Sequence, residues 1–207
     1  MEQANHDAVL EVRGLHFSWP GVPLFRDLDL VLPAGVSAVC GDESSGKTTL
    51  LRLLSGELQP ERGSIVVRGA CAQSPGDGVF RTEPRSKALD AISALTWWAG
   101  LPSNCRTFNV KLASELARGF ALEPHIEKPM YMLSAGSKRK VWLCAAFAAG
   151  TTLTLIDEPF AALDLASVRF LMSLLTEASG HPSRAWVLGD HAPPEGLLLN
   201  SLLVLGG

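Results

Sequence analysis

The chain has 207 residues, of which 47% are hydrophobic, and its 18 basic and 21 acidic residues give a formal net charge of −3. This composition supports one large folded domain, residues 1–207, and excludes global disorder. A general binder of nucleic acid or of an anionic membrane would need a basic excess, so we expect no nucleic-acid partner.

The first third of the chain alternates between apolar and polar residues, as half-buried strands do. Such strands are predicted over residues 8–19, 24–32 and 61–69. The short run VSAVC, residues 36–40, is apolar throughout and predicts a buried strand. From Gly46 onward, the leucines of GKTTLLRLLSGEL fall on one face of a predicted helix.

The middle of the chain changes to helical patterns, from about Glu83 to Ala149, with Pro84 at a helix start. Residues 74–149 are therefore interpreted as an approximate helical subdomain, entered through a hinge at SPGDG, residues 74–78. Trp97 and Trp98 are interpreted as anchors of the core or of a partner groove. A strand over 152–157, a helix over 164–179, a strand over 184–191 and an edge strand within 198–207 complete the chain.

Residues 41–48 read GDESSGKT, which fits the pattern GxxxxGK[ST] of a phosphate-binding loop between a strand and a helix. Glycines let backbone N–H groups point at phosphate oxygens, and the following helix N-terminus favours an anion. Lys47 would bridge the terminal phosphates, and the Thr48 hydroxyl would ligate Mg²⁺. The alternative is a capped turn before a core helix, because Asp42 and Glu43 place negative charge beside the loop.

The stretch LTLIDEPFAALD, residues 153–164, places two acids at the end of an apolar strand. Asp157 can hold Mg²⁺, directly or through water, and Glu158 can polarise a water for attack on a γ-phosphate. The alternative is an ordinary acidic boundary between strand and loop. That boundary is common with one acid and less common with two acids followed by proline.

A third motif, LSAGSKRK at residues 133–140, places a loop of small residues before a helix. Lys138, Arg139 and Lys140 fall in the first turn of that helix, where cations oppose the helix dipole. An anion that docks at this turn would offset the opposition. A solvated basic turn is the alternative interpretation.

In this order, the three motifs resemble those of the nucleotide-binding subunit of an ABC transporter, and the resemblance covers nearly the whole chain. It implies an α/β fold, in which a P-loop NTPase core with a parallel sheet carries a small antiparallel β-subdomain and an inserted helical subdomain. It also implies ATP and Mg²⁺ as ligands. A weaker resemblance, through the LSAG loop and DEPFAALD, is to the haem-exporter ATP-binding subunit of cytochrome c maturation.

The resemblance assigns roles to individual residues. Trp19 matches the adenine platform, Gln73 the Gln loop and His191 the histidine that contacts the γ-phosphate. Catalysis is assigned to Glu158, His191, Lys47 and Gln73. ATP binding is assigned to Trp19, Gly41, Asp42, Glu43, Ser44, Ser45, Gly46, Lys47, Thr48, Thr49, Ser134, Gly136, Ser137 and Asp164. The metal is assigned to Thr48, Gln73 and Asp157.

The resemblance also implies partners and a location. A second nucleotide-binding subunit, identical or homologous, would form a dimer, and integral membrane permease subunits would bind that dimer at the inner, cytoplasmic face of the cell membrane. The chain departs from the family where Glu43, Ser44 and Ser45 stand in the phosphate loop and where Ala135 and Ser137 replace a glycine and a glutamine. Two alternatives stay open: a regulatory subunit that binds ATP with little hydrolysis, which these departures favour, and a soluble ABC-type ATPase without a transport role.

Overall fold

The computed structural model describes residues 8–68, 78–103 and 105–206 of the chain. Strands and α-helices follow one another in this order: β1 (Ala8–Trp19), β2 (Val22–Pro33), β3 (Gly35–Cys40), α1 (Lys47–Leu54), β4 (Arg62–Val67), β5 (Val79–Arg81), α2 (Ala94–Gly100), α3 (Val110–Gly119), α4 (Ala135–Ala148), β6 (Leu153–Asp157), α5 (Leu165–Ser179), β7 (Ala185–Asp190) and β8 (Ser201–Val204). The strands predicted in the first third of the chain and after residue 150 are confirmed, as is the helix after Gly46.

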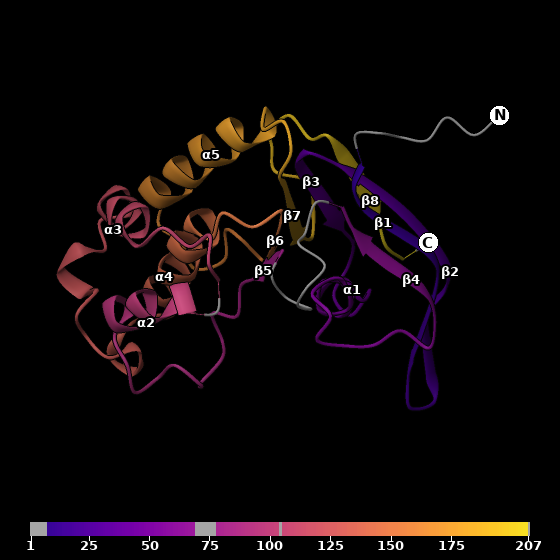
Figure 1. Cartoon of the computed structure of the whole chain (residues 1–207), viewed down its shortest axis with the longest axis horizontal. Helices are drawn as coiled ribbons and strands as arrows, with labels where there is room; N and C mark the ends of the chain where they lie inside the picture. The colour runs from indigo at the N-terminus through magenta and orange to yellow at the C-terminus, as the bar shows by residue number, and fades with distance from the viewer. Residues whose placement is uncertain (1–7, 69–77, 104, 207) are drawn as a thin grey trace.

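The strands form two sheets, which lie beside each other in Figure 1. β2, β1 and β4 make an antiparallel sheet in that order. β5, β6, β7, β3 and β8 make a sheet in which all pairs are parallel, with β8 at the edge as predicted. Helices α2, α3 and α4 gather at the end of the molecule opposite the antiparallel sheet. The parallel core, the small antiparallel sheet and the helical region are the parts of the predicted fold class.

Each face of the parallel sheet contributes to a different hydrophobic core. Along β7, Trp186 and Leu188 belong to the core shared with the helical region, whereas Ala185 and Val187 belong to the core shared with α1 and the antiparallel sheet. This division follows from the two-residue period of a strand, in which successive side chains point to opposite faces. The sheet is covered on both sides, so its strands read as apolar runs without alternation.

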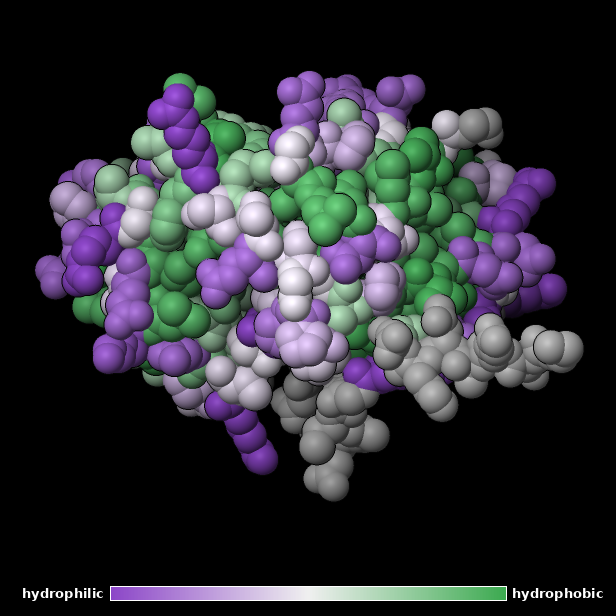
Figure 2. Space-filling model, turned by 90° about the horizontal axis from the view of Figure 1, so that it is seen from above, coloured by the Kyte–Doolittle hydropathy of each residue, from purple (hydrophilic) through white to green (hydrophobic). Residues whose placement is uncertain are grey.

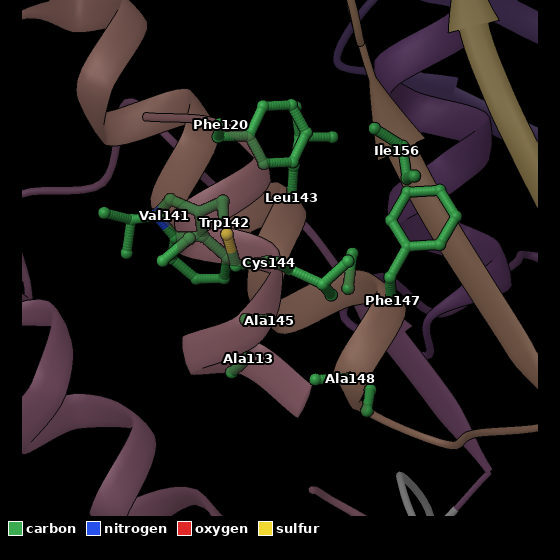
Figure 3. Close-up of a cluster of buried hydrophobic side chains, with 14 of the residues drawn as sticks. Ala113, Phe120, Val141, Trp142, Leu143, Cys144, Ala145, Phe147, Ala148 and Ile156 are labelled. Carbon is green, nitrogen blue, oxygen red and sulfur yellow. The ribbon is translucent and has the colours of Figure 1, made fainter. Parts of the chain in front are cut away.

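Helix α4 is buried around most of its circumference. Every residue from Val141 to Ala148 is buried, and α4 packs against α3 on one side and β6 on the other. Figure 3 shows side chains radiating from the helix, with Phe147 directed toward Ile156 of β6 and Ala113 close by on α3. A helix that is apolar all round belongs inside a core. The run VWLCAAFA therefore fixes the position of the loop that precedes α4.

The segment between β5 and α2 corrects one prediction. Pro84 does not start a helix, because successive turns occupy residues 83–92 and α2 begins only at Ala94. The reason is the contact of Thr82 with β6. The Thr82 N–H donates to the carbonyl of Leu155 at 3.0 Å and continues the pairing of β5 with β6, so the chain is still extended just before Pro84. Ser93 then caps α2 by accepting from the N–H of Thr96 at 3.1 Å.

The predicted division of the chain at residues 74–149 stays a prediction. Within that range β5 belongs to the parallel sheet, and the described helices run from Ala94 to Ala148. Residues 74–77 of the predicted hinge lie outside the described residues.

The surface mixes polar and apolar side chains. Seen from above, apolar areas lie between polar ones without a continuous apolar belt on that face (Figure 2). Large apolar side chains more than a third exposed include Leu165 at the start of α5 and Leu202 on β8. No helix in the described part of the chain is long and apolar enough to cross a bilayer.

The aromatic anchor of the helical region supplies the first prediction. Trp98 on α2 is fully buried, and its neighbour Trp97 contacts the ring of Trp142 with centroids 4.4 Å apart. We expect Trp98→Ala to lower the free energy of unfolding by about 3–5 kcal/mol, because it leaves a cavity in the core. Urea denaturation measures the change. The matched control is Leu95→Ala on the same helix, whose side chain is 37% exposed; an equal loss in both variants would contradict the prediction.

Candidate functional site

The site lies at the carboxyl ends of the parallel strands. β3 ends at Cys40, directly opposite Asp190 at the end of β7, and Asp157 at the end of β6 lies opposite Gly189. The loops that follow these three strands therefore start from one edge of the sheet. Ligands of open α/β sheets bind at this edge, outside the carboxyl ends of the strands.

The loop after β3 wraps its backbone tightly around the N-terminus of α1. Gly46 has a φ of 100° in the left-handed region, which glycine adopts without strain. It occupies the N-cap position of α1 without a side-chain cap, so the first N–H groups of the helix have no side-chain acceptor there. A Cβ at Gly41 would lie 2.4 Å from the carbonyl oxygen of Leu205. The two glycines of the motif are thus required by backbone geometry.

Lys47 is folded back over this loop. Its Nζ donates to the carbonyl oxygens of Gly41 and Asp42, each at 2.7 Å, and the side chain is largely buried. An ammonium held by two neutral carbonyls carries an unneutralised charge. It is therefore available to an anion that enters the loop.

Thr48 and Asp157 join the first and second motifs. The Thr48 hydroxyl donates to Oδ2 of Asp157 at 2.7 Å. Burial raises the pKa of Asp157; the Thr48 hydrogen bond opposes this effect and the nearby Glu158 charge adds to it. A hydroxyl and a carboxylate are hard oxygen ligands, the kind that Mg²⁺ prefers. The described residues contain no group of three or more His, Cys, Asp or Glu side chains suited to a metal.

Glu158 is held at both its backbone and its side chain. Its φ is 47°, in the left-handed region, and its N–H donates to the carbonyl of Gly189 at 2.8 Å. The buried Arg139 guanidinium donates to the carbonyl oxygens of Asp157, at 3.0 Å, and of Glu158. The side-chain carboxylate of Glu158 forms an ion pair with Arg85. Glu158 is thus fixed by a residue of the helix α4 and by a residue of the loop after β5.

These elements border one cleft of about 580 Å³. The described residues around it come from β1, β2, the phosphate loop, the loop after β5 and the ends of β6 and β7: Trp19, Val22, Leu24, Glu43, Ser44, Gly46, Lys47, Thr48, Thr49, Arg85, Asp157, Glu158, Asp190 and His191. His191 is exposed and follows β7, as predicted, and its N–H donates to the Asp190 carboxylate at 2.7 Å. The cleft thus brings together Trp19, most of the phosphate loop, the two acids and His191.

The LSAG loop lies elsewhere. Ser134 is the N-cap of α4 and accepts from the N–H of Ser137 at 3.1 Å. Gly136 packs so closely on the loop after β6 that a Cβ there would lie 2.3 Å from the carbonyl oxygen of Ala162. Among the described residues that line the 580 Å³ cleft, none comes from this loop, and Asp164 is also absent.

The three cations after this loop have partners within the chain. Lys138 forms an ion pair with Asp90 at 2.6 Å, and Lys140 forms one with Asp164 at 2.7 Å. Arg139 points inward to the carbonyls at the end of β6. Because α4 begins at Ala135, only Lys138 lies in its first turn, and the predicted placement of Arg139 and Lys140 there is wrong by one turn. Internal acids and carbonyls are the partners of these cations.

Gln73 lies outside the described residues, so its assigned role remains a prediction. Sequence reasoning missed a different segment near the acids. Residues 82–86, directly after β5, border a second hollow of about 260 Å³ together with Thr48, Asp157 and Glu158. The signal that could have identified it was the pattern VFRT, a short apolar strand that ends in polar residues.

Comparisons with known proteins agree with this geometry. A family model described as ABC transporter matches residues 25–161. The taurine import ATP-binding protein TauB of Pseudomonas putida is 31% identical over 207 residues, which cover 96% of this chain and 78% of the relative. The Escherichia coli K12 protein of the same name is 29% identical, with 95% and 79% covered.

Solved structures share the fold. An ATP-binding subunit of an ABC transporter superposes with a TM-score of 0.79 at 22% identity, covering 88% of this chain and 79% of that one. A component of the cbiONQ ABC transporter complex of Clostridium perfringens has a TM-score of 0.66 at 21% identity, covering 90% and 80%.

Asp164 supplies a pH-dependent prediction. Hydrogen bonds from Lys140, and then from the N–H and hydroxyl of Ser167, hold its pKa well below the ordinary range. Because the folded-state pKa is depressed, the stabilisation is present above the unfolded pKa of about 3.9 and is lost as pH falls toward the folded pKa. We expect Asp164→Asn, which keeps the N-cap acceptor, to be less stable than the wild type at pH 7. This difference should shrink below about pH 4.

Urea denaturation at pH 7, 4 and 3 measures the effect. Lys140→Met is the matched variant, and the double variant should lose less stability than the sum of the two single changes. Strict additivity, or a difference that does not change with pH, would contradict the assignment.

Proposed function

The chain belongs to the ABC transporter family as an ATP-binding and ATP-hydrolysing subunit, and we propose that it works as a head-to-tail dimer with a second nucleotide-binding subunit. One observation carries the proposal: the site is divided. Among the described residues, the cleft holds the phosphate loop and the acids, whereas Ser134, Gly136 and Ser137 lie outside it. A second copy in the opposite orientation would bring its LSAG loop across the open side of the cleft.

ATP would bind along the cleft from Trp19 to the end of β6. The indole of Trp19 is 40% exposed at the cleft, where it can stack on the adenine. The loop from Gly41 to Thr49 would surround the phosphates with N–H groups. Lys47 would exchange its two carbonyl acceptors for the β- and γ-phosphate oxygens.

Thr48 and Asp157 would hold Mg²⁺, with Gln73 as a further contact. When bound, Mg²⁺ would neutralise charge that develops on the phosphates. The rest of the chemistry belongs to side chains. Glu158 would orient a water and accept its proton as the water attacks the γ-phosphate, and His191 would donate a hydrogen bond to that phosphate.

The partner subunit would complete the site. Its Ser134 and Gly136 would present the N-terminus of α4 to the γ-phosphate, with Ser137 beside them, and Asp164 would lie near the interface. Hydrolysis removes the phosphate that joins the two subunits and so reopens the dimer. Through the loop after β5 and the helical region, this motion would reach the membrane permease subunits.

The location follows from the same partners. The dimer would sit at the cytoplasmic face of the membrane, bound to permease subunits that supply the spans. The names of the similar TauB proteins favour uptake as the direction of transport. They also favour a transport role over a soluble ATPase without one.

The first test is Glu158→Gln. We expect it to lower ATP turnover by about 10²–10⁴-fold, because a general base is lost, while ATP still binds. In size exclusion with Mg-ATP, the variant should run as a dimer, because the bound triphosphate persists. Glu115→Gln on the exposed face of α3 is the matched control. ATP binding without turnover in the wild type as well would favour the regulatory alternative.

The head-to-tail arrangement is tested by mixing two inactive variants. Lys47→Ala disables the phosphate loop, whereas Ser134→Asp keeps the N-cap of α4 and repels the γ-phosphate of the partner's ATP. A mixed dimer has one site with both halves intact. Random assortment makes half of the dimers mixed, so about a quarter of wild-type turnover should return. No recovery, with dimers present, would contradict the shared site.

A further inference from the structure

We propose that Arg85 is a positioning residue for ATP hydrolysis, which holds the side-chain carboxylate of Glu158 at the mouth of the nucleotide cleft. This inference rests on the proposed function and adds a residue to its site. The resemblance assigned a catalytic and metal-binding role to Gln73, which precedes β5 and lies outside the described residues. In the described structure, the loop after β5 reaches the acids through Arg85.

The contact between the two residues is direct. Nη2 of Arg85 lies 2.5 Å from Oε2 of Glu158, and both side chains border the 580 Å³ cleft and the adjoining 260 Å³ hollow. A second guanidinium, Nη2 of Arg139, lies 3.7 Å from the same oxygen on the buried side. Two arginines therefore approach the same oxygen of the Glu158 carboxylate, the largely buried Arg139 and the exposed Arg85.

The backbone of Glu158 is already fixed without Arg85. Gly189 accepts from its N–H, and Arg139 donates to its carbonyl oxygen. A φ of 47° is strained for glutamate and persists only where surrounding contacts impose it. The remaining freedom is in the side-chain torsions, and Arg85 makes the contact that restricts them at the cleft.

Arg85 is itself carried by a turn that hydrogen bonds and ion pairs hold in place. Thr82 ties the start of the turn to β6, because its N–H donates to Leu155 and its hydroxyl lies 3.4 Å from the N–H of Asp157. The N–H of Ser86 donates to the carbonyl of Glu83 at 2.9 Å and closes a four-residue turn with Pro84 at its second position. Arg81 forms ion pairs with Glu83 on the turn and with Glu57 after α1.

The ion pair between Arg85 and Glu158 contributes little to the stability of the fold. The side chain of Arg85 is 78% exposed, and exposed ion pairs add little stability. A carboxylate next to Asp157, however, is repelled by that acid and by an incoming triphosphate. Without a cation at the cleft, the Glu158 side chain would turn away from the phosphate. Arg85 therefore acts on geometry at the reacting water, where small displacements are costly to the rate.

Steady-state kinetics of purified full-length Arg85→Ala test the proposal. We expect kcat to fall about ten- to a hundredfold while KM for ATP changes less than about twofold, because position is lost and nucleotide contacts are kept. Arg85→Lys should recover part of kcat, because it keeps the charge and loses the planar fork. The melting temperature should be unchanged. Lys87→Ala, an exposed cation two residues along the same loop, is the matched control and should behave as the wild type.

The double variant decides between positioning and phosphate binding. If Arg85 acts through Glu158, then adding Arg85→Ala to Glu158→Gln lowers kcat no further. A further decrease, a raised KM alone, or an unchanged or raised kcat in the single variant would overturn the proposal. Full turnover in Arg85→Ala beside lost turnover in Glu158→Gln would reject the role of Arg85 and leave the proposed function standing.

Discussion

Parallel pairing of β3 with β7, and of β7 with β6, is the constraint on which the site depends. Parallel strands end at the same edge, so loops that are far apart in the sequence start from neighbouring positions. The hydrogen bond between Thr48 and Asp157 joins residues 109 positions apart for this reason. The apolar runs that build the strands therefore do more than form a core. They align the phosphate loop, the two acids and His191 to a common register.

Helix α4 links this edge to the surface that would meet a partner. Its apolar part is locked between α3 and β6, and its first turn carries the LSAG loop. Arg139 connects the two regions, because it lies near the start of α4 and its guanidinium donates to the carbonyls of Asp157 and Glu158. Burial lowers the pKa of this guanidinium, and the Glu158 charge opposes that effect. A displacement of α4 would therefore move Glu158, the residue proposed to activate water.

Short-range sequence patterns predicted the elements whose structure depends on neighbouring residues in the chain. Alternation gave the strands, and the glycine and lysine spacing of residues 41–48 gave the phosphate loop and the start of α1. Pro84 was misread because a proline and a run of helix formers fit a helix start, while the pairing of Thr82 with β6 is a tertiary contact. The partners of Lys138 and Lys140 were not predictable for the same reason: their acids, Asp90 and Asp164, lie 48 and 24 residues away. The VFRT pattern marked the loop that holds Arg85, but it did not single out Arg85 itself, because the contact with Glu158 joins residues 73 positions apart.

The charge of the cleft shapes how a nucleotide would bind. The described residues that line it include four acids, Glu43, Asp157, Glu158 and Asp190, but only two cations, Lys47 and Arg85. In the proposed site, Arg85 is engaged by Glu158, so Lys47 alone is available to the phosphates. Attraction must then come from backbone N–H groups at the start of α1 and from a divalent cation on Thr48 and Asp157. In the proposed site, a triphosphate without its metal would meet net negative charge, so nucleotide affinity would depend on the metal more than on side-chain cations.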